Sequence, residues 1–351
     1  MGDNINRIFN SEHDFCLANN DISYVPSESA VHFRNDCAPI MRYLEDSTTF
    51  PFIVWGWDKA LKHKLLKGGV NPVSLPSDEY LEQVRTLSHR AEAIRCLSYI
   101  KGKLAPGETI CDTAPVEVKT FEDVLKTVDE YKDTILKSPW SSSGKGLRMV
   151  NLHSWTESDK GWVRNILAKQ GSLIIEKRAK PALDFSMQFA TSAEGVKFWG
   201  YSIFKATHGA YQGNLLASNE YMESLITRYI KKELLQQVRI AISEFLFNEF
   251  VGRYEGNLGV DMFIDASQEG RYSLNPCVEI NVRNNFGLVA RLYYDKYFQL
   301  SHPQQDGLFQ MSIFYSPQNG SLKQILPSDC IVLSGELQAE SHYAIAVIPE
   351  N

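Results

Sequence analysis

The first hundred residues alternate between short apolar runs and helical spacing. Residues 52–55 form an apolar run with the length of a buried strand, and Leu61, Leu65 and Leu66 continue at the spacing of a helix. A second strand is predicted at 70–75. Ser77 is a favourable helix N-cap, and apolar positions keep the helical spacing from 81 to 100. Residues 1–50 are polar and are predicted to be irregular, so the chain begins with a small α/β region.

The rest of the chain predicts a mixture of helices and strands. Helices are predicted at 120–131 and 156–169, and one long helix between 220 and 251, where apolar residues recur every three or four positions. Short strands are predicted at 134–136, 147–151, 173–176, 185–191 and 197–204. Strands at 258–264 and 272–280 flank a polar turn at 267–270, which predicts a β-hairpin. The fold class that follows is α+β, preceded by the α/β region.

Composition limits the class of protein. The chain has 351 residues, of which 44% are hydrophobic and 22% charged, and its formal net charge is −6. This is the composition of a soluble globular protein with about two or three lobes. The negative charge argues against a protein that coats nucleic acid or an anionic membrane, since both select for clustered Lys and Arg. No apolar run reaches the roughly 20 residues of a membrane span, and the N-terminus lacks the pattern of a secretory signal, so we expect a cytoplasmic protein.

The cysteines and histidines do not predict a zinc site. No C-x-x-C pair is present, and the eight histidines are dispersed. We therefore expect free and mostly buried thiols at all six cysteines, which are Cys16, Cys37, Cys96, Cys111, Cys277 and Cys330.

A glycine-rich segment, 141–146, follows the predicted strand that ends at Lys137. It is not a P-loop, because the G-x-x-x-x-G-K-[ST] pattern would need Gly at position 139, which is Pro, and Ser or Thr at position 146, which is Gly. A loop of small residues can still bring backbone N–H groups close to phosphate. An ordinary hairpin turn is the alternative, in which Lys137 would be a surface lysine. The residues of this candidate loop are Ser141, Ser142, Ser143, Gly144, Lys145 and Gly146.

The sharpest candidate chemistry lies on the predicted hairpin. Asp261 interrupts an apolar strand, and Glu279, Asn281 and Arg283 alternate with apolar residues, at 278, 280 and 282, that we expect in the core. The period of two places the three polar residues on one face of the strand. If the two strands pair, Asp261 lies near Glu279, and two carboxylates with an amide oxygen suit Mg²⁺. Arg283 would then answer phosphate or carboxylate charge. The alternative is an exposed polar face on an edge strand.

The order of these features resembles the ATP-grasp superfamily, over residues 90–300 or roughly 60% of the chain. The features are the strand lysine Lys137, the glycine-rich loop, the segment Leu173–Lys177, Asp184, and the set from Asp261 to Arg283. The resemblance implies two α+β lobes that clamp ATP, preceded by a small α/β domain. The domains expected on this basis are an N-terminal domain at 1–89, a first lobe with the glycine-rich loop at 90–175, a second lobe with the Mg²⁺-binding strands at 176–326, and a C-terminal strand or tail at 327–351.

The resemblance also implies roles for individual residues. Lys137 would contact the α- and β-phosphates, Glu176 and Lys177 would lie at a hinge that contacts adenine, and Asp184 would face the ribose. Asp261, Glu279 and Asn281 match the magnesium ligands. Two catalytic residues are expected: Arg283, which would stabilise the developing phosphoryl charge, and Lys205, in a lid or substrate-facing segment. An exposed loop lysine is the alternative for Lys205. Arg90 would replace a nucleotide-binding lysine of the family.

The function implied is that of an ATP-dependent ligase. Such an enzyme activates a carboxylate as an acylphosphate for attack by an amine and forms ADP and phosphate, chiefly by positioning and charge neutralisation. The expected cofactors are ATP and Mg²⁺, with Mn²⁺ as a substitute. The expected partners are small carboxylate and amine substrates, or a second copy in a homodimer, but not nucleic acid or membrane. A phosphotransferase and a non-catalytic nucleotide-binding module are the alternatives.

Overall fold

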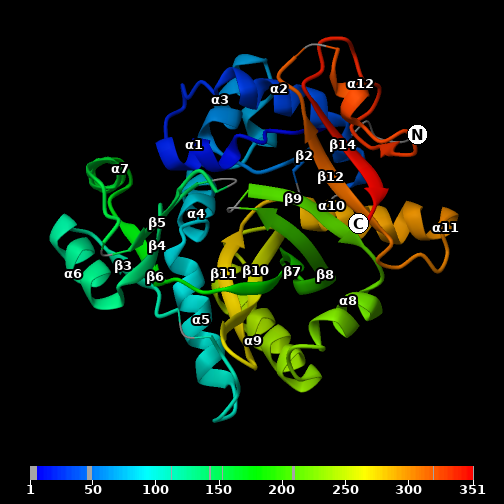
Figure 1. The fold of residues 1–351 in the computed structure, drawn as a ribbon. Helices are drawn as coiled ribbons and strands as arrows, with labels where there is room; N and C mark the ends of the chain where they lie inside the picture. The colour runs from blue at the N-terminus through cyan, green and yellow to red at the C-terminus, as the bar shows by residue number, and fades with distance from the viewer. Residues whose placement is uncertain are drawn as a thin grey trace.

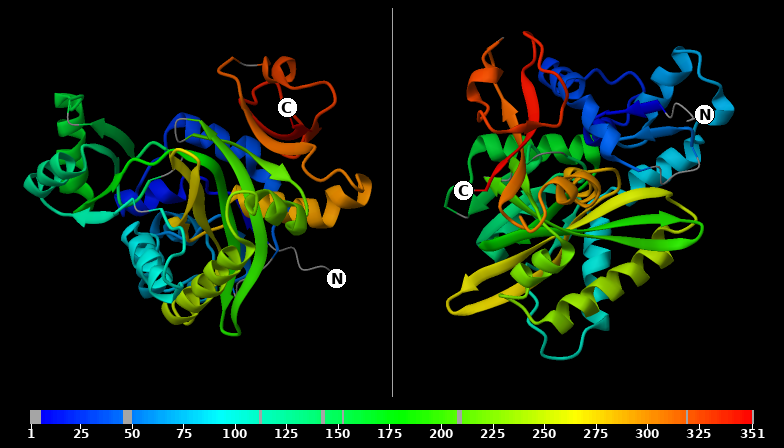
Figure 2. Two further views of the ribbon diagram at one scale, coloured as in Figure 1. Left: turned by 60° about the horizontal axis from the view of Figure 1, so that its bottom comes forward. Right: turned by 90° about the vertical axis from the view of Figure 1, so that its right-hand side faces the viewer.

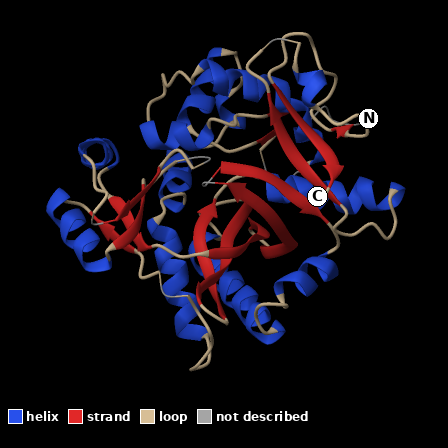
Figure 3. Ribbon diagram, in the orientation of Figure 1, coloured by secondary structure: helices blue, strands red, loops and turns tan. Residues whose placement is uncertain are grey.

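The computed structural model describes residues 6–45, 50–111, 113–141, 144–151, 153–207, 210–318 and 320–350. Three sheets are present in these residues, with two, four and eight strands (Figures 1 and 3). Helices pack against each of them, so the predicted α+β fold class is confirmed. Within this described part, no helix has both the length and the apolar character needed to cross a bilayer.

The N-terminal region is built around a parallel pair of short strands, β1 (Asn6–Ile8) and β2 (Phe52–Val54). Between them lie α1 (His13–Asn19), α2 (Glu28–Cys37) and the 3-10 helix η1 (Ala38–Tyr43). The prediction that residues 1–50 are irregular is therefore wrong for 6–45. Ser27 caps α2 by accepting a hydrogen bond from Ala30 N, and Ile40 and Met41 are buried, so this polar segment still contributes to a core.

The predicted helices after β2 are confirmed, but the strand predicted at 70–75 is wrong. The helices are α3 (Lys59–Lys67), α4 (Asp78–Leu87) and α5 (Ala91–Lys103). Residues 70–75 instead contain a 3-10 turn, η2 (Pro72–Ser74). Asn71 Oδ1 accepts a hydrogen bond from Val73 N over 3.1 Å, and Pro72 has no N–H to give to a strand partner, so the local turn forms.

The four-stranded sheet forms a separate lobe at the side of the molecule (Figure 2, left). Its strands are antiparallel in the order β3-β6-β4-β5. Two helices, α6 (Phe121–Tyr131) and α7 (Glu157–Gln170), share its core with Leu136, Val150 and Leu173. The strands are β3 (Val116–Val118), β4 (Asp133–Lys137), β5 (Leu147–Asn151) and β6 (Leu173–Lys177). All of these except β3 were predicted, and those predictions are confirmed.

The eight-stranded sheet is antiparallel in the order β11-β10-β7-β8-β9-β12-β14-β13. One face of its first strands packs on α5 and α9 (Lys232–Phe250), beside which they lie in Figure 1. Near its other face lie α10 (Phe286–Tyr293) and the π-turn η3 (Tyr294–Phe298), followed by the short helices α11 (Gln299–Ser301) and α12 (Leu322–Ile325). The strands are β7 (Pro181–Ser192), β8 (Gly195–Thr207), β9 (Ala210–Leu216), β10 (Gly256–Gln268), β11 (Arg271–Asn281), β12 (Phe309–Tyr315), β13 (Ile331–Val332) and β14 (Tyr343–Pro349).

Two details of the second half differ from the sequence prediction. The helix expected over 220–251 is two helices, α8 (Asn219–Ile226) and α9. They are separated by a tight turn in which Arg228 N donates to Leu225 O and Tyr229 N donates to Ile226 O, so the helical hydrogen-bond pattern ends there. The hairpin of β10 and β11 is confirmed, but a bulge opposite residues 261–263 changes the alternation. Cys277 therefore lies in the core, where Val278 was expected.

The division into domains stays a prediction. The predicted first lobe begins at residue 90, whereas α5 contributes side chains to the core of the large sheet together with α9. The predicted C-terminal tail contains β13 and β14, which are paired into the same large sheet. The six cysteines are free, and all but Cys330 are buried, so the predicted free thiols are confirmed.

Candidate functional site

Two acidic side chains meet on the face of the large sheet that is turned away from α5 and α9. Asp261 on β10 is the direct cross-strand partner of Glu279 on β11. Their neighbours Val260 and Ile280 are buried in the core on the opposite face. The alternation predicted from the sequence is therefore confirmed at these positions, and it brings the two carboxylates together.

Asn281 and Arg283 extend this acidic pair along β11. Asn281 Nδ2 donates to Asp261 Oδ2 over 2.9 Å, and Asn281 Oδ1 accepts from Arg283 Nη2 over 3.0 Å. The four residues predicted from the hairpin thus form one connected set. We call Asp261, Glu279, Asn281 and Arg283 the strand cluster.

The pKa values of two carboxyl groups show how unfavourable the negative charge is here. Burial, followed by the charge of Glu279, raises the pKa of Asp261 to about 7. Burial also raises the pKa of Asp184 to about 6. Asp184 lies on β7 opposite Phe263, two residues from the position opposite Asp261, so it shares this sheet face. A cation bound on this face would stabilise the ionised form of both carboxyl groups.

Arg90 joins the strand cluster to the four-stranded lobe. It lies at the start of α5 and is buried. Its Nη1 donates to Ser138 O and to Ser141 Oγ, each over 2.7 Å, and its Nη2 donates to Glu279 Oε1 over 2.8 Å. The residue predicted to bind nucleotide therefore links the beginning of the glycine-rich loop directly to a predicted metal ligand.

Lys137 and Glu176 form a second ion pair inside the four-stranded lobe. They lie on the neighbouring strands β4 and β6, each side chain is 7% exposed, and Lys137 Nζ is 2.6 Å from Glu176 Oε1. A buried pair of this kind needs good geometry to offset its desolvation. The predicted hinge lies where the chain leaves β6 and enters β7 of the large sheet, so Glu176 is at the passage between the two sheets.

The glycine-rich loop closes on itself between β4 and β5. Ser138 N donates to Gly146 O over 2.9 Å, and a Cβ at Gly146 would overlap Ser138 and Ser141, so only glycine fits there. Gly144 has a φ of +73°, which also favours glycine. Lys145 Nζ lies 5.3 Å from the centre of the Phe15 ring on α1. Two predicted loop residues, Ser142 and Ser143, lie outside the described residues.

Two predicted lysines have contacts away from the strand cluster. Lys177 Nζ lies 5.2 Å from the Tyr131 ring, and its backbone N donates to Thr113 O. Lys205 on β8 is ion-paired with Glu350 near the C-terminus, with Nζ and Oε1 2.5 Å apart. The structure does not bring Lys205 to the strand cluster through any contact among the described residues, so its catalytic role stays a prediction.

Asp14 on α1 is a site residue that the sequence pattern does not predict. Its carboxylate takes hydrogen bonds from Arg283 Nε, over 2.9 Å to Oδ1, and from Nη2, over 2.8 Å to Oδ2. Burial opposes ionisation of Asp14, but the Arg283 guanidinium outweighs it and lowers the pKa of this carboxyl. Asp14 also lines a cavity of about 10 Å³ with Ser141, Glu279 and Asn281. No spacing in the sequence could reveal a partner 269 residues away.

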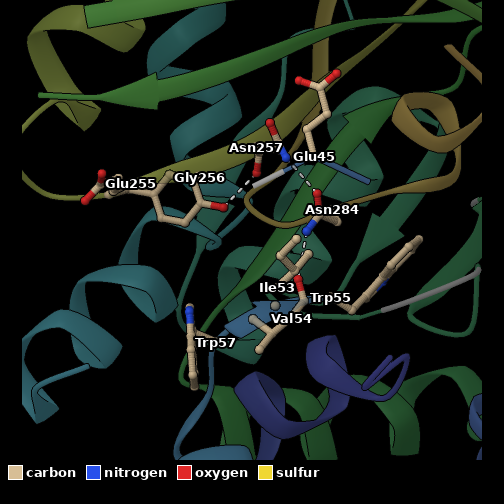
Figure 4. Close-up of a pocket in the computed structure, with 11 residues that line it drawn as sticks. Glu45, Ile53, Val54, Trp55, Trp57, Glu255, Gly256, Asn257 and Asn284 are labelled. Atoms are coloured by element: carbon tan, nitrogen blue, oxygen red, sulfur yellow. Dashed lines mark hydrogen bonds between the residues drawn. The ribbon is translucent and has the colours of Figure 1, made fainter. Parts of the chain in front are cut away.

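A second small cavity, of about 20 Å³, lies beside Asn284 and has room for about one water molecule (Figure 4). Asn284 lines it: its Nδ2 donates to Val54 O over 2.7 Å, and its Oδ1 accepts from Asn257 Nδ2 over 2.9 Å. These bonds tie the residue after Arg283 to β2 and to β10. The residues that line this cavity therefore support the strand cluster, and the cavity is not itself the candidate site.

The donor atoms of the strand cluster fit Mg²⁺ in part. Glu279 uses Oε1 for Arg90, and Asp261 uses Oδ2 for Asn281, so Glu279 Oε2 and Asp261 Oδ1 accept no hydrogen bond from the described residues. Carboxylate oxygens are the ligands that Mg²⁺ prefers. The amide oxygen of Asn281 is engaged by Arg283, so its predicted role as third ligand needs a change of partner. No group of three or more His, Cys, Asp or Glu in the described ranges could hold a metal ion.

Comparisons with known proteins give a similarity of fold only. No protein-family model matches the sequence, and no curated protein matches it. An N⁵-carboxyaminoimidazole ribonucleotide synthetase in complex with ADP aligns with 78% of this chain and 70% of its own, at 16% identity and a TM-score of 0.48. The corresponding synthase from Aspergillus clavatus, with ADP and 5-aminoimidazole ribonucleotide, aligns with 95% of this chain and 85% of its own, at 13% identity and a TM-score of 0.48.

A biotin carboxylase–β,γ-ATP complex from Campylobacter jejuni aligns with 76% of this chain and 64% of its own, at 14% identity and a TM-score of 0.44. These solved structures are ATP-grasp proteins. Identities below 25% and TM-scores below 0.5 describe a general likeness of architecture and do not identify the activity of this chain.

Proposed function

We propose that the chain is an ATP-grasp enzyme that uses Mg²⁺–ATP to activate a small carboxylate as an acylphosphate, which an amine then attacks. The observation that carries this proposal is the position of Arg90. Its guanidinium joins the start of the glycine-rich loop, at Ser138 and Ser141, to Glu279 of the strand cluster. A loop suited to phosphate and a pair of carboxylates suited to Mg²⁺ therefore lie on either side of one cation.

The charges of the site suit phosphoryl transfer. The acidic pair would hold Mg²⁺ through Glu279 Oε2 and Asp261 Oδ1, and the ion would supply charge neutralisation for the nucleotide phosphates. Arg90 and Lys145 would face the phosphates from the loop side, and Arg283 from the sheet side. Catalysis of this kind depends chiefly on fixed positions and fixed charges, which the ion pairs of Arg90 and Arg283 provide.

The roles of the other predicted residues follow from their elements. We propose that Lys137, at the end of β4, contacts the α- and β-phosphates after a change of partner from Glu176. The backbone of Glu176 and Lys177 would contact adenine where β6 leads into β7, and Asp184 would face the ribose. The acid and the amine would be small molecules.

Phosphate release tests this function. The purified protein is incubated with Mg²⁺–ATP and pools of carboxylic acids, including bicarbonate and amino acids, with and without pools of amines. We expect orthophosphate to form only when an acid and an amine are both present. Phosphate that stays on the acceptor would instead show a phosphotransferase.

The matched variants are Glu279→Gln and Glu269→Gln. Glu279→Gln removes one charge from the strand cluster and should abolish phosphate release, whereas Glu269 lies in the exposed turn between β10 and β11, so its substitution should have no effect. If calorimetry finds no binding of Mg²⁺–ATP to the wild-type protein, the proposal is wrong. Equal phosphate release by wild type and Glu279→Gln would contradict the assignment of the site.

A further inference from the structure

Helix α1 contacts both sides of the proposed site through two consecutive residues. Asp14 binds Arg283 of the strand cluster, and Phe15 lies against Lys145 of the glycine-rich loop. Consecutive residues of a helix point in directions about 100° apart, so one helix can contact two walls of a cleft.

The hydrogen bonds of Arg283 leave it little freedom. A guanidinium has five N–H groups. Arg283 gives Nε and one Nη2 hydrogen to Asp14, the second Nη2 hydrogen to Asn281 Oδ1, and one Nη1 hydrogen to Asn284 O. One Nη1 hydrogen remains for a ligand. Arg283 therefore cannot grip a phosphate with two parallel hydrogen bonds while Asp14 holds it, and it acts as a fixed single donor.

Helix α1 is itself held firmly. His13 is buried against Gly56, where a Cβ would overlap its ring, and its Nδ1 lies 3.3 Å from Asp58 Oδ2. Near the other end, Arg85 Nε donates to Leu17 O over 2.9 Å. Because both ends of α1 are anchored, the positions of Asp14 and Phe15 are set by the N-terminal region as a whole.

We infer that α1 is a positioning element of the nucleotide site. Asp14 fixes the Arg283 guanidinium so that its remaining N–H meets the terminal phosphoryl group of ATP. Phe15 holds Lys145 of the glycine-rich loop, which faces the same phosphoryl group. The inference rests on the proposed function. Asp14 and Phe15 are positioning residues, because they act through Arg283 and Lys145. The specific consequence is that the preference for Mg²⁺–ATP over Mg²⁺–ADP depends on Asp14.

Calorimetric titration with Mg²⁺–ATP and Mg²⁺–ADP tests the role of Asp14 without any acceptor substrate. Asp14→Asn keeps the shape of the side chain and should reduce the ATP/ADP affinity ratio by about 10-fold, the effect of one charge-assisted hydrogen bond. Asp21→Asn, the same change at an exposed position after α1, should leave the ratio unchanged. In an Arg283→Gln background, Asp14→Asn should change the ratio less than about 2-fold.

Trypsin cleavage after Lys145 tests the role of Phe15. Phe15→Leu keeps an apolar side chain but removes the ring face, so cleavage should be about threefold faster than in wild type. Phe247→Leu, at an exposed position of α9, is the control. Thermal unfolding of each variant shows whether the fold is intact.

The failures are distinguishable. If wild type binds no Mg²⁺–ATP, the proposed function is wrong and this inference falls with it. If wild type binds Mg²⁺–ATP but Asp14→Asn keeps the wild-type ATP/ADP ratio, or lowers it equally in the Arg283→Gln background, Asp14 does not position Arg283 and the inference alone is overturned. Cleavage after Lys145 that is unchanged in Phe15→Leu overturns the part that concerns the loop.

Discussion

Arg90 Nη2 and Glu279 Oε1 form an ion pair of 2.8 Å that connects two parts of the chain 189 residues apart. Arg90 is 7% exposed and Glu279 28% exposed. The same guanidinium also binds Ser138 O and Ser141 Oγ, so it has three partners on two structural units. Arg90 is thus the residue whose loss would most directly separate the glycine-rich loop from the strand cluster.

Arg90→Lys should weaken this connection although it keeps the charge. A lysine ammonium on a flexible stem does not reproduce the fixed fork of a guanidinium, so we expect at least one of the three hydrogen bonds to be lost. Affinity for Mg²⁺–ATP should fall by about 10-fold, as measured by calorimetry. Arg95→Lys, on the same helix but about half exposed, is the matched control. Equal affinities for the two variants would show that Arg90 does not organise the site.

The buried pair of Lys137 and Glu176 predicts an effect on stability. Lys137→Met leaves the Glu176 carboxylate buried without its cation, which should lower the free energy of unfolding by about 3–5 kcal/mol. The double variant Lys137→Met/Glu176→Leu removes both charges and should recover most of this loss. Urea denaturation measures each value. Lys132→Met, at an exposed ion pair of the same lobe, should behave like wild type.

That experiment also separates structure from nucleotide binding. Both Lys137 variants lack the cation that we propose for the α- and β-phosphates, so both should bind Mg²⁺–ATP poorly, although the double variant is stable. Recovery of nucleotide binding along with stability would show that Lys137 is purely structural.

Local pattern predicted much of the fold, and the exceptions have local causes. The strands at 147–151 and 173–176 and the hairpin of β10 and β11 match closely, because alternation and turn composition determine them. The strand expected at 70–75 fails because Asn71 and Pro72 form a turn. The long helix is interrupted after Ile226, where Arg228 N donates to Leu225 O and Tyr229 N donates to Ile226 O in a tight turn.

In the candidate site, too, local contacts could be predicted from the sequence and long-range contacts could not. Asp261 and Glu279 could be paired from the sequence because they lie on one hairpin, where the register is set by a short turn. Asp14 could not be predicted, since it reaches Arg283 only when α1 folds against the segment that follows β11, 269 residues later in the chain. The partner of Lys205 could not be predicted for the same reason. Glu350 is distant from Lys205 in the sequence and follows β14, which pairs with β12 in the large sheet.

Asp261 predicts a dependence of stability on pH. The ordinary pKa of its carboxyl group is 3.8, and burial beside Glu279 raises this pKa to about 7 in the folded protein. Below pH 3.8 the group is protonated in both states. As pH rises from there toward 7 the unfolded chain loses its proton first, so the folded state loses stability over this range.

Asp261→Asn is neutral at every pH and removes this penalty. Relative to wild type, the variant should therefore gain up to about 3 kcal/mol in free energy of unfolding between pH 5 and pH 8, measured by urea denaturation with EDTA present. Asp129→Asn, at an exposed position of α6, should show no such gain. A difference between Asp261→Asn and wild type that does not grow with pH would mean that the carboxyl ionises normally in the folded protein.

Substitution of Gly146 by Ala should destabilise the protein, whereas the same substitution at Gly161 should stabilise it. A Cβ at Gly146 would overlap Ser138 and Ser141, the residues that Arg90 binds, so Gly146→Ala should disturb the loop and lower both the melting temperature and the affinity for Mg²⁺–ATP. Gly161 lies within α7 with no atom close to the position of its Cβ, so Gly161→Ala should stabilise the protein by about 0.5–1 kcal/mol. Differential scanning calorimetry and nucleotide titration of both variants measure the two effects. Gly146→Ala could match wild type in melting temperature and in affinity for Mg²⁺–ATP only if the loop opened at this point. That result would mean that the tight closure between Ser138 and Gly146 is not needed to hold Arg90 against Glu279.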